Sequence, residues 1–417
     1  MRTTNSDKLY YGWIVVAALF LAGFVVYGGG LYSFVLFVTP LTQEFHWSRA
    51  ATGGIVSAFW LTAPLIVFGG FGIQRFGVMR LLVAGIVLEA LCVLMLASVS
   101  TLWQVYLLRA AMGFGKLLFA VTIPFTVAIW FSRRFALALG IAWAGWHVGG
   151  MALAPITAAI IAHGGWRSAC VALAATLVTL ALLPVLWVLR VPAPASIGLS
   201  VDGASPGTEQ QRVIEARGGD SHGLGGVLRA PNFWLIAVAT IFFYTTYGGL
   251  LAHQAAIVES AGFTLGTASL VLGSTAGFAA LGGLTIGWAL DRYPLVWVGV
   301  LVHGLLLAGA GALLLVNSVA WTWLLVAYAA SFGLMIGGSD IFFVTLMRQA
   351  FPKVSVGHTY SAWYCVELAT LFLAPIAAGW MFDQSGNYGA TLLILAGSAI
   401  AAAVTSTAAM RLNAGTV

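Results

Sequence analysis

The chain has 417 residues, of which 61% are hydrophobic and only 7% are charged, and its mean hydropathy is +1.00. Soluble globular proteins carry about 25% charged residues, so this composition excludes an ordinary soluble domain. The formal net charge is +6, and the positions of the 18 basic residues decide whether it reflects nucleic-acid binding or membrane topology.

Apolar runs recur along the whole chain. A bilayer-spanning helix takes roughly 20 to 25 residues, and the chain contains twelve such runs, bounded by Gly, Pro, Asn or charged residues. The first run lacks a small-residue cleavage site, so we interpret it as a retained helix and not as a signal peptide. The predicted spans cover residues 11–38, 50–74, 79–99, 103–129, 136–161, 168–189, 232–257, 264–290, 294–316, 320–347, 357–381 and 388–410.

The basic residues orient these spans. With the N-terminus in the cytoplasm, the inner connections hold 14 of them, the outer connections hold Arg49 and Arg167, and Arg109 and Lys116 lie within a span. The positive-inside rule therefore predicts that both termini are cytoplasmic. Since topology accounts for the basic balance, we expect no nucleic-acid partner. The inner residues are Arg2, Lys8, Arg75, Arg80, Arg133, Arg134, Arg190, Arg212, Arg217, Arg229, Arg292, Arg348, Lys353 and Arg411.

One long polar stretch divides the spans six and six. Residues 191–230 are rich in Gly, Ser, Pro and charge and predict a cytoplasmic linker between bundles at 1–190 and 231–417. The halves resemble each other at a shift of about 220 residues. Because six is even, both halves enter the membrane in the same sense, which predicts an all-α membrane protein of two pseudo-symmetric six-helix bundles. The repeated positions are Trp13 and Trp234, Tyr27-Gly28-Gly29 and Tyr247-Gly248-Gly249, and Ala154-Pro155-Ile156 and Ala374-Pro375-Ile376.

A glycine- and arginine-rich run, Gly70 to Arg80, joins the second and third spans, and its echo runs from Gly287 to Arg292. These runs resemble the Gly-x-x-x-Asp-Arg-x-Gly-x-Arg signature of the major facilitator superfamily, which implies an alternating-access transporter. Gln74 stands where that family usually has Asp, so the charge-assisted contact is weaker in the first half, whereas Asp291 retains it in the second. We predict a cytoplasmic gate that stabilises the outward-facing state and comprises Arg75, Arg80, Arg133, Arg134, Asp291 and Arg292.

Two further stretches, Tyr10 to Val16 and Trp130 to Gly150, resemble bacterial members of the monocarboxylate transporter and oxalate/formate antiporter branch. The resemblance implies transport of small organic acids, often with a proton, across a bacterial plasma (inner) membrane. Such carriers usually place an Arg in the eighth span just before a Gly-Trp pair, to bind the carboxylate. Gly283 occupies the matching position here, so the usual anion-binding residue is missing.

Ionisable residues inside the spans carry the remaining evidence on chemistry, because each costs at least about 2.5 to 3.5 kcal/mol near the bilayer centre unless paired or hydrated. Lys116 lies near the middle of the fourth span and is predicted either to bind an anionic substrate or to form a structural ion pair. Arg109 lies nearly on the same face, and the run Arg109 to Gly115 resembles a fourth-span motif of the superfamily, which implies a role in proton transfer or in helix packing. Glu367 shares a polar aromatic face with Tyr360, Trp363 and Tyr364, and is predicted to couple proton or substrate, or to pair with Lys116 or Arg109.

The other candidates carry less weight. Asp340, in a glycine-rich part of the tenth span, is interpreted as a gate or as a helix-packing acceptor. His147 and His253 are kept as substrate or proton ligands, although a lone intramembrane His is usually a satisfied interhelical donor. His303 and Glu89 are interpreted as structural, and the superfamily resemblance implies that the span of Glu89 is peripheral. The cysteines Cys92, Cys170 and Cys365 lie far apart, without metal or disulfide spacing.

No enzyme motif competes with a transporter. The chain lacks a phosphate-binding loop and a pair of His residues at metal-ligand spacing, and its linker is too short to bury a catalytic core. We expect no cofactor, and a monomer whose partners are a small molecule, a proton and the bilayer. The substrate is left open between a carboxylate, an amphoteric molecule and an apolar compound expelled by proton antiport. A membrane sensor that retains a carrier fold is the alternative from another class.

Overall fold

The computed structural model describes residues 10–47, 55, 58–201, 223–316, 322–352, 354, 356–385 and 387–414. Most of the predicted linker lies outside these residues. So do several basic residues counted above, namely Arg2, Lys8, Arg49, Arg212, Arg217 and Lys353.

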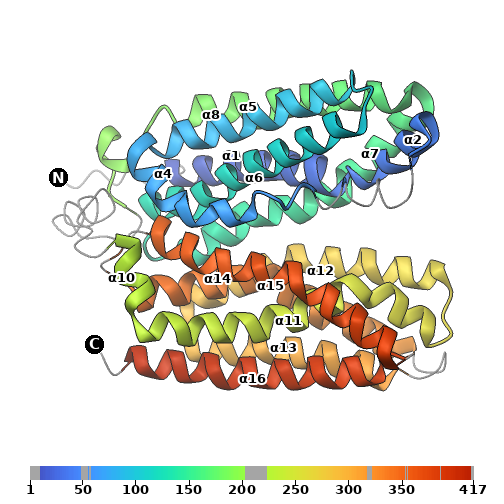
Figure 1. Ribbon diagram of the computed structural model, residues 1–417. Helices are drawn as coiled ribbons and strands as arrows, with labels where there is room; N and C mark the ends of the chain where they lie inside the picture. Colours follow the sequence, from blue (N-terminus) through green and yellow to red (C-terminus); the bar gives the residue numbers. More distant parts are fainter. Residues whose placement is uncertain are drawn as a thin grey trace.

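The first half of the described chain is helical throughout its apolar runs (Figure 1). The first span comprises α1 (Tyr11–Tyr27), a π-helical segment η1 (Gly28–Tyr32) and α2 (Val35–Phe45), and the second ends in η2 (Ala63–Phe68) and α4 (Gly69–Phe76). They are followed by α5 (Val78–Leu96), α6 (Leu102–Trp130), α7 (Phe135–Thr176), η3 (Leu177–Leu182) and α8 (Leu183–Val188).

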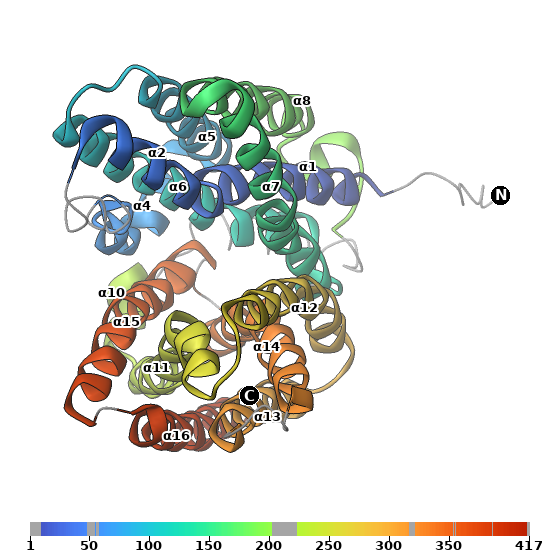
Figure 2. The ribbon, with the colours of Figure 1, turned by 90° about the vertical axis from the view of Figure 1, so that its right-hand side faces the viewer.

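The second half begins after a short turn, η4 (Pro194–Ile197), and the linker. Its helices are α10 (Gly223–Arg229), α11 (Pro231–Ser260), α12 (Leu265–Arg292), α13 (Leu295–Leu315), α14 (Thr322–Ala350), α15 (Val356–Ser385) and α16 (Tyr388–Ala414). Seen end-on, α1 to α8 gather in one group and α10 to α16 in another (Figure 2).

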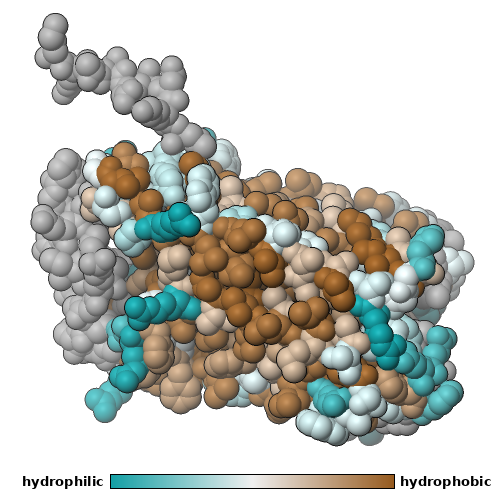
Figure 3. Space-filling view, turned by 90° about the horizontal axis from the view of Figure 1, so that it is seen from above, coloured by the Kyte–Doolittle hydropathy of each residue, from teal (hydrophilic) through white to brown (hydrophobic). Residues whose placement is uncertain are grey.

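The twelve predicted spans are confirmed. Among the described residues, ten helical segments are long and apolar enough to cross a membrane, and one of them, Phe135–Val188, contains a reversal at Gly165. The φ angle there is 79°, which glycine adopts without the steric cost that a side chain imposes. That segment therefore supplies the fifth and sixth spans, and η2 with α4 supplies the end of the second. On the face shown in Figure 3, hydrophobic side chains cover the middle of the molecule, and hydrophilic ones gather towards its two ends.

The molecule has two chemically different ends. At one end α1 begins and α16 stops, and the arginines that precede α7 or close α4, α12, α14 and α16 lie there (Figure 1). We refer to it as the arginine-rich end. At the opposite end, Arg167 forms an ion pair with Glu44 at 2.7 Å, joining α2 to the turn within α7. Hydrogen bonds from Arg167 lower the pKa of the Glu44 carboxyl, so the contribution of this pair to stability is present at neutral pH and is lost as the pH falls through that lowered pKa.

The two bundles pack closely in the half of the molecule nearest the arginine-rich end. Helix α7 lies against α12, and η2 and α4 lie against α15. At the first contact a Cβ atom on Gly140 would overlap the carbonyl oxygen of Gly283, and one on Gly283 would lie 3.2 Å from the carbonyl oxygen of Gly140. Only residues without side chains allow the two backbones to approach this closely. The same contact explains why position 283 has no room for an arginine.

Candidate functional site

Lys116 lies where the two bundles meet, deep in the apolar layer. It belongs to α6 of the first bundle and is only 5% exposed. Its Nζ atom donates a hydrogen bond of 2.9 Å to the hydroxyl of Tyr364, on α15 of the second bundle. A single lysine thus links the two halves of the molecule.

Aromatic rings surround the Lys116 ammonium group. The Nζ atom lies 4.7 Å from the ring centre of Trp60, 5.3 Å from that of Tyr27 and 5.4 Å from that of Tyr364. Cation–π attraction of this kind is stronger in a desolvated site than in water. Tyr27 is in turn stacked on Trp146 at 4.0 Å, which fixes its ring against the fifth span. These rings hold the charge in place without neutralising it.

The space beside Lys116 is small. Its volume is about 10 Å³, close to what one water molecule requires. An organic molecule therefore fits only if side chains or bundles move apart. The lining residues are Phe59, Trp60, Ala63, Gly113, Lys116, Leu117, Tyr364 and Leu368.

Glu367 lies one helical turn from Tyr364 on α15 and is 3% exposed. Its Oε2 atom has no hydrogen-bond partner. Although Glu367 and Lys116 both lie in the described part of the chain, no ion pair joins them, and the Lys116 ammonium bonds the Tyr364 hydroxyl instead. The Lys116 ammonium and the Glu367 carboxyl interact electrostatically without direct contact, so a ligand that binds one of them changes the electrostatic potential at the other.

Asp340 is a hydrogen-bond acceptor within the second bundle. Its Oδ1 atom accepts from the Tyr244 hydroxyl at 2.7 Å and from the Ser339 hydroxyl at 3.2 Å. Tyr244 lies on α11 and Asp340 on α14, so the contact ties the seventh span to the tenth. Of the two roles that the sequence left open, this geometry favours helix packing.

Arg109 is almost completely buried and contacts the first span. Its Nη1 atom donates to the carbonyl oxygen of Gly30 at 2.9 Å, and its guanidinium lies 3.5 Å from the ring centre of Phe34. The ring of Phe59 covers it at 4.5 Å. Arg109 therefore does not contact the rings of Tyr27, Trp60 and Tyr364 that surround Lys116, although both basic residues lie on α6.

In the described part of the chain, none of the three candidate histidines contacts Lys116. His253 contacts the Tyr388 hydroxyl at 3.2 Å and the Pro375 carbonyl at 3.1 Å, which ties α11 to α15 and α16. The Nδ1 atom of His303 bonds the carbonyl of Gly299 within its own helix. His147 is partly buried on α7, and no hydrogen bond of its side chain is found in the described part of the chain. That part also holds no group of three His, Cys, Asp or Glu residues that could bind a metal ion.

Asp291 closes the arginine-rich end by capping a helix of the other bundle. Its carboxylate oxygens accept from the backbone N–H groups of Ala136 at 2.9 Å and Leu137 at 2.8 Å, in the first turn of α7. The residue preceding that helix, Arg134, provides no side-chain cap of its own. A carboxylate at a helix N-terminus satisfies free donors and interacts favourably with the helix dipole. The cap therefore stabilises the contact of α7 with α12.

In the other half, the equivalent contact is made by an uncharged amide side chain. Gln74, at the end of α4, lies against the first turn of α15, with its Nε2 atom 3.5 Å from Nδ1 of His358. This is the pseudo-symmetric counterpart of Asp291 against α7. An amide there cannot supply the negative charge that a carboxylate supplies, so this contact lacks the favourable interaction with the helix dipole that Asp291 makes.

The arginines predicted to form the gate lie at the surface of the molecule. Arg75, Arg80, Arg133, Arg134 and Arg292 are all exposed. The guanidinium of Arg292 lies 4.7 Å from the ring centre of Trp288 on the same helix. The guanidinium of Arg348, in the second bundle, lies 4.3 Å from the ring centre of Phe135, in the first, so this contact joins the two bundles.

Replacing Asp291 by asparagine is expected to shift the protein away from the state described here. Losing a capping carboxylate costs about 1 kcal/mol, or about a fivefold change in the ratio of the two states. Gln74→Asp is the matched control, since it adds a charge at the equivalent site and should shift the ratio the opposite way. Cysteine accessibility from each side of the membrane measures both. An unchanged distribution in Asp291→Asn would show that the cap has no gating role.

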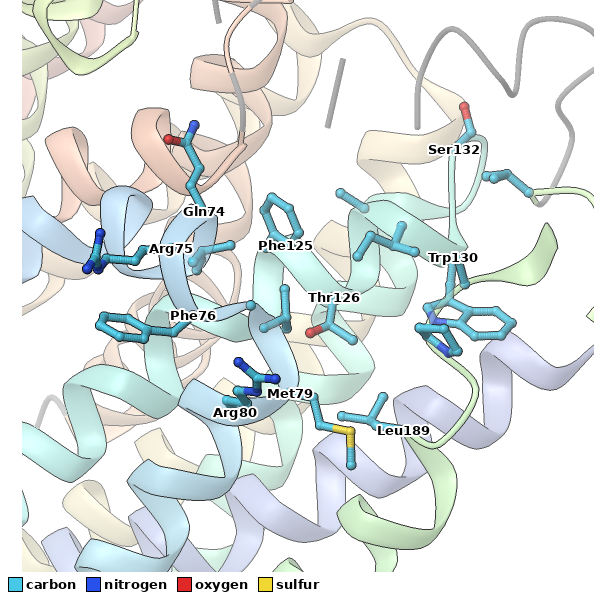
Figure 4. A pocket seen from close by; sticks show the side chains of 18 residues that line it. Gln74, Arg75, Phe76, Met79, Arg80, Phe125, Thr126, Trp130, Ser132 and Leu189 are labelled. Atoms are coloured by element: carbon cyan, nitrogen blue, oxygen red, sulfur yellow. The ribbon is translucent and has the colours of Figure 1, made fainter. Parts of the chain in front are cut away.

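A larger cavity, of about 560 Å³, lies at the arginine-rich end of the first bundle (Figure 4). Phe125, Thr126 and Trp130 of α6 line one side, and Met79 and Arg80 of α5 line another. It belongs to one bundle only and is separate from Lys116, so it is not the meeting point of the two halves.

Some residues of the site were not singled out from the sequence. Trp60 and Phe59 lie beside Lys116 but come from the second span, and nothing local to them indicates that they face it. Tyr27 was marked in the sequence only as the first residue of the repeated Tyr-Gly-Gly motif. No sequence pattern pointed to His358, because its contact with Gln74 joins residues 284 positions apart.

Comparisons with known proteins agree with this architecture. A family model described as Major Facilitator Superfamily matches residues 19–302. The chain is 30% identical to human monocarboxylate transporter 11 over 404 residues, covering 94% of this chain and 81% of the relative. It is 25% identical to a gallate transporter of Pseudomonas putida over 373 residues, covering 81% and 78%.

Solved structures share the fold. The proton:xylose symporter XylE, bound to 6-bromo-6-deoxy-D-glucose, gives a TM-score of 0.71 at 14% identity, covering 94% of each chain. FucP in the outward conformation gives 0.69 at 16% identity, covering 96% of this chain and 99% of that one.

Proposed function

The chain belongs to the major facilitator superfamily, in its monocarboxylate transporter branch, and we propose that it transports a small organic acid together with a proton by alternating access. The position of Lys116 is the observation that carries this proposal. It places a buried positive charge on one bundle against a hydroxyl of the other, at the level where a substrate must be held in turn from each side.

The packing around Gly283 supports Lys116 as the anion-binding residue. Relatives in this branch usually bind the carboxylate through an arginine of the eighth span, but position 283 is filled by the backbone of Gly140. A buried cation elsewhere must then provide the charge. Lys116 faces the second bundle, whereas Arg109 is held by Gly30 within its own bundle.

Proton coupling follows from the pair of Lys116 and Glu367. When a substrate carboxylate bonds Lys116 in place of the Tyr364 hydroxyl, it offsets the positive charge that favours ionised Glu367. A buried carboxylate without a partner costs more free energy than the neutral acid, so Glu367 takes up a proton as the substrate binds. Substrate and proton are thus bound together and released together.

The closed end sets the direction of access. We infer from the positive-inside rule that the arginine-rich end is cytoplasmic and that both termini lie there. The contact of Gly140 with Gly283 and the Asp291 cap then close the cytoplasmic side. We therefore infer that the state described here is closed to the cytoplasm.

Uptake into proteoliposomes tests the function. With a panel of small aliphatic and aromatic monocarboxylates, including gallate, we expect one or more to accumulate when an inward proton gradient is imposed and not when it is dissipated. The aromatic members are included because three rings face the Lys116 ammonium. Gradient-driven export of an amphoteric or apolar compound would instead favour an antiporter, and absence of any flux would favour a sensor.

A further inference from the structure

The first bundle contains a second buried carboxylate, Glu89, that the proposed mechanism does not use. It lies in α5 and its exposed fraction is 0%. Neither Oε1 nor Oε2 has a hydrogen-bond partner. The sequence indicated a structural residue on a peripheral span, but the side chain points into the bundle and makes none of the hydrogen bonds by which a structural carboxylate is satisfied.

Glu89 lies against the π-helical segment of the first span. A Cβ atom placed on Gly30 would overlap Oε1 of Glu89, so a larger residue at that point of η1 would have to displace the end of the Glu89 side chain. The carbonyl of the same glycine accepts the hydrogen bond from Arg109. Carboxylate and guanidinium therefore contact one residue from two sides. Single-turn π-helical segments within α-helices occur frequently at functional sites.

The charged groups that act on Glu89 come from one helix. They are Arg109 and Lys116, both on α6, and His147 of α7 is not among them. On α5 itself, the Cys92 thiol is the titratable neighbour. From η1 the contact is the neutral backbone of Gly30. Arg109 attracts Glu89 but forms no ion pair with it, because its Nη1 atom is engaged by the Gly30 carbonyl and the rings of Phe34 and Phe59 cover its faces.

A carboxylate in this setting is more stable as the neutral acid, since a buried charge needs a partner or hydrogen bonds. We propose that Glu89 is a second proton-binding site of the transporter, protonated in the state described here, and that its ionisation draws Arg109 away from Gly30 and releases η1. The proton leaves the Glu89 carboxyl for water. The resulting carboxylate and Arg109 then form the ion pair that is absent here, and the Gly30 carbonyl loses its donor.

The proposal rests on the proposed function only in that a proton is the coupling ion, and its test needs no substrate. Infrared spectra of purified protein at neutral pH should show the C=O stretch of a protonated carboxylic acid. Glu89→Gln should remove one component of this band, and that component should remain in Glu367→Gln. Glu89→Met serves as a second neutral variant should the first fail to fold. Absence of a band assignable to Glu89 would mean that it is ionised, and the proposal would be wrong.

The link to η1 is measured separately. A cysteine replacing Tyr32, in a background without the three native cysteines, should gain reactivity with rising pH beyond the gain that ionisation of its own thiol causes, and this excess should vanish in Glu89→Gln. Gly30→Ala should destabilise the protein, and Glu89→Ala should restore it, because the overlap is with that side chain. An excess over thiol ionisation that persists in Glu89→Gln would contradict the switch. Loss of coupling in Glu367→Gln reports on the proposed function alone, so the two can fail independently.

Discussion

Lys116→Ala is expected to weaken binding of the transported acid roughly 100-fold, since removing one partner of a buried, hydrogen-bonded charge pair costs about 2 to 5 kcal/mol. The ammonium group is the charge nearest the second bundle, and its present partner, the Tyr364 hydroxyl, is neutral, so a carboxylate is a better acceptor. Isothermal titration of the purified protein with the acid identified by uptake measures this loss.

Tyr364→Phe is the matched control. It removes the hydroxyl that accepts from Lys116 but leaves the ring that lies 5.4 Å from the ammonium, so the affinity should change by less than about tenfold. Lys116→Arg retains the charge in a space of about 10 Å³, and binding should be weaker than in the wild type but stronger than in Lys116→Ala. If Lys116→Ala bound the acid with unchanged affinity, Lys116 would not be the anion-binding residue. Either Arg109 would bind the anion, or the hypothesis of an organic-acid substrate would be wrong.

Glu367→Gln is expected to abolish accumulation driven by a proton gradient while leaving counterflow exchange of the acid intact. Glutamine resembles the protonated carboxylic acid in shape and charge, so the variant should behave as if the coupling proton were always bound. Uptake that rises as the external pH falls in the wild type should therefore become independent of pH. Proteoliposome assays of exchange and of net accumulation, run side by side, separate the two activities.

Asp340→Asn is the comparison for this experiment, because Asp340 is also a partly buried carboxylate of the second bundle but accepts hydrogen bonds from Tyr244 and Ser339. It should retain pH-dependent accumulation. If Glu367→Gln still concentrated the acid under a proton gradient alone, the coupling residue would have to be Glu89, Asp340 or one of the histidines.

The position of Glu89 shows where reasoning from sequence stops. Its helical neighbours are apolar, as they would be on a helix facing lipid, and the sequence does not distinguish lipid from the interior of a bundle. In the structure that surface packs against α6 and the first span, which buries the carboxylate completely. The contact with Gly30 spans 59 positions and leaves no local pattern in either segment.

The sequence alone determined the membrane class, the twelve spans, the pseudo-symmetric halves and the family, because the bilayer imposes length, hydropathy and charge asymmetry on every span locally. It also identified Lys116 and Glu367, since a charge among apolar residues is conspicuous at any position. Only the tertiary structure decided what these charges contact. It placed Tyr364 and not Glu367 on Lys116, made Asp291 a cap on α7, and filled the place of the missing arginine with the backbone of Gly140. Such contacts depend on how helices distant in the chain are rotated and packed, and the hydropathy of each helix does not encode that rotation.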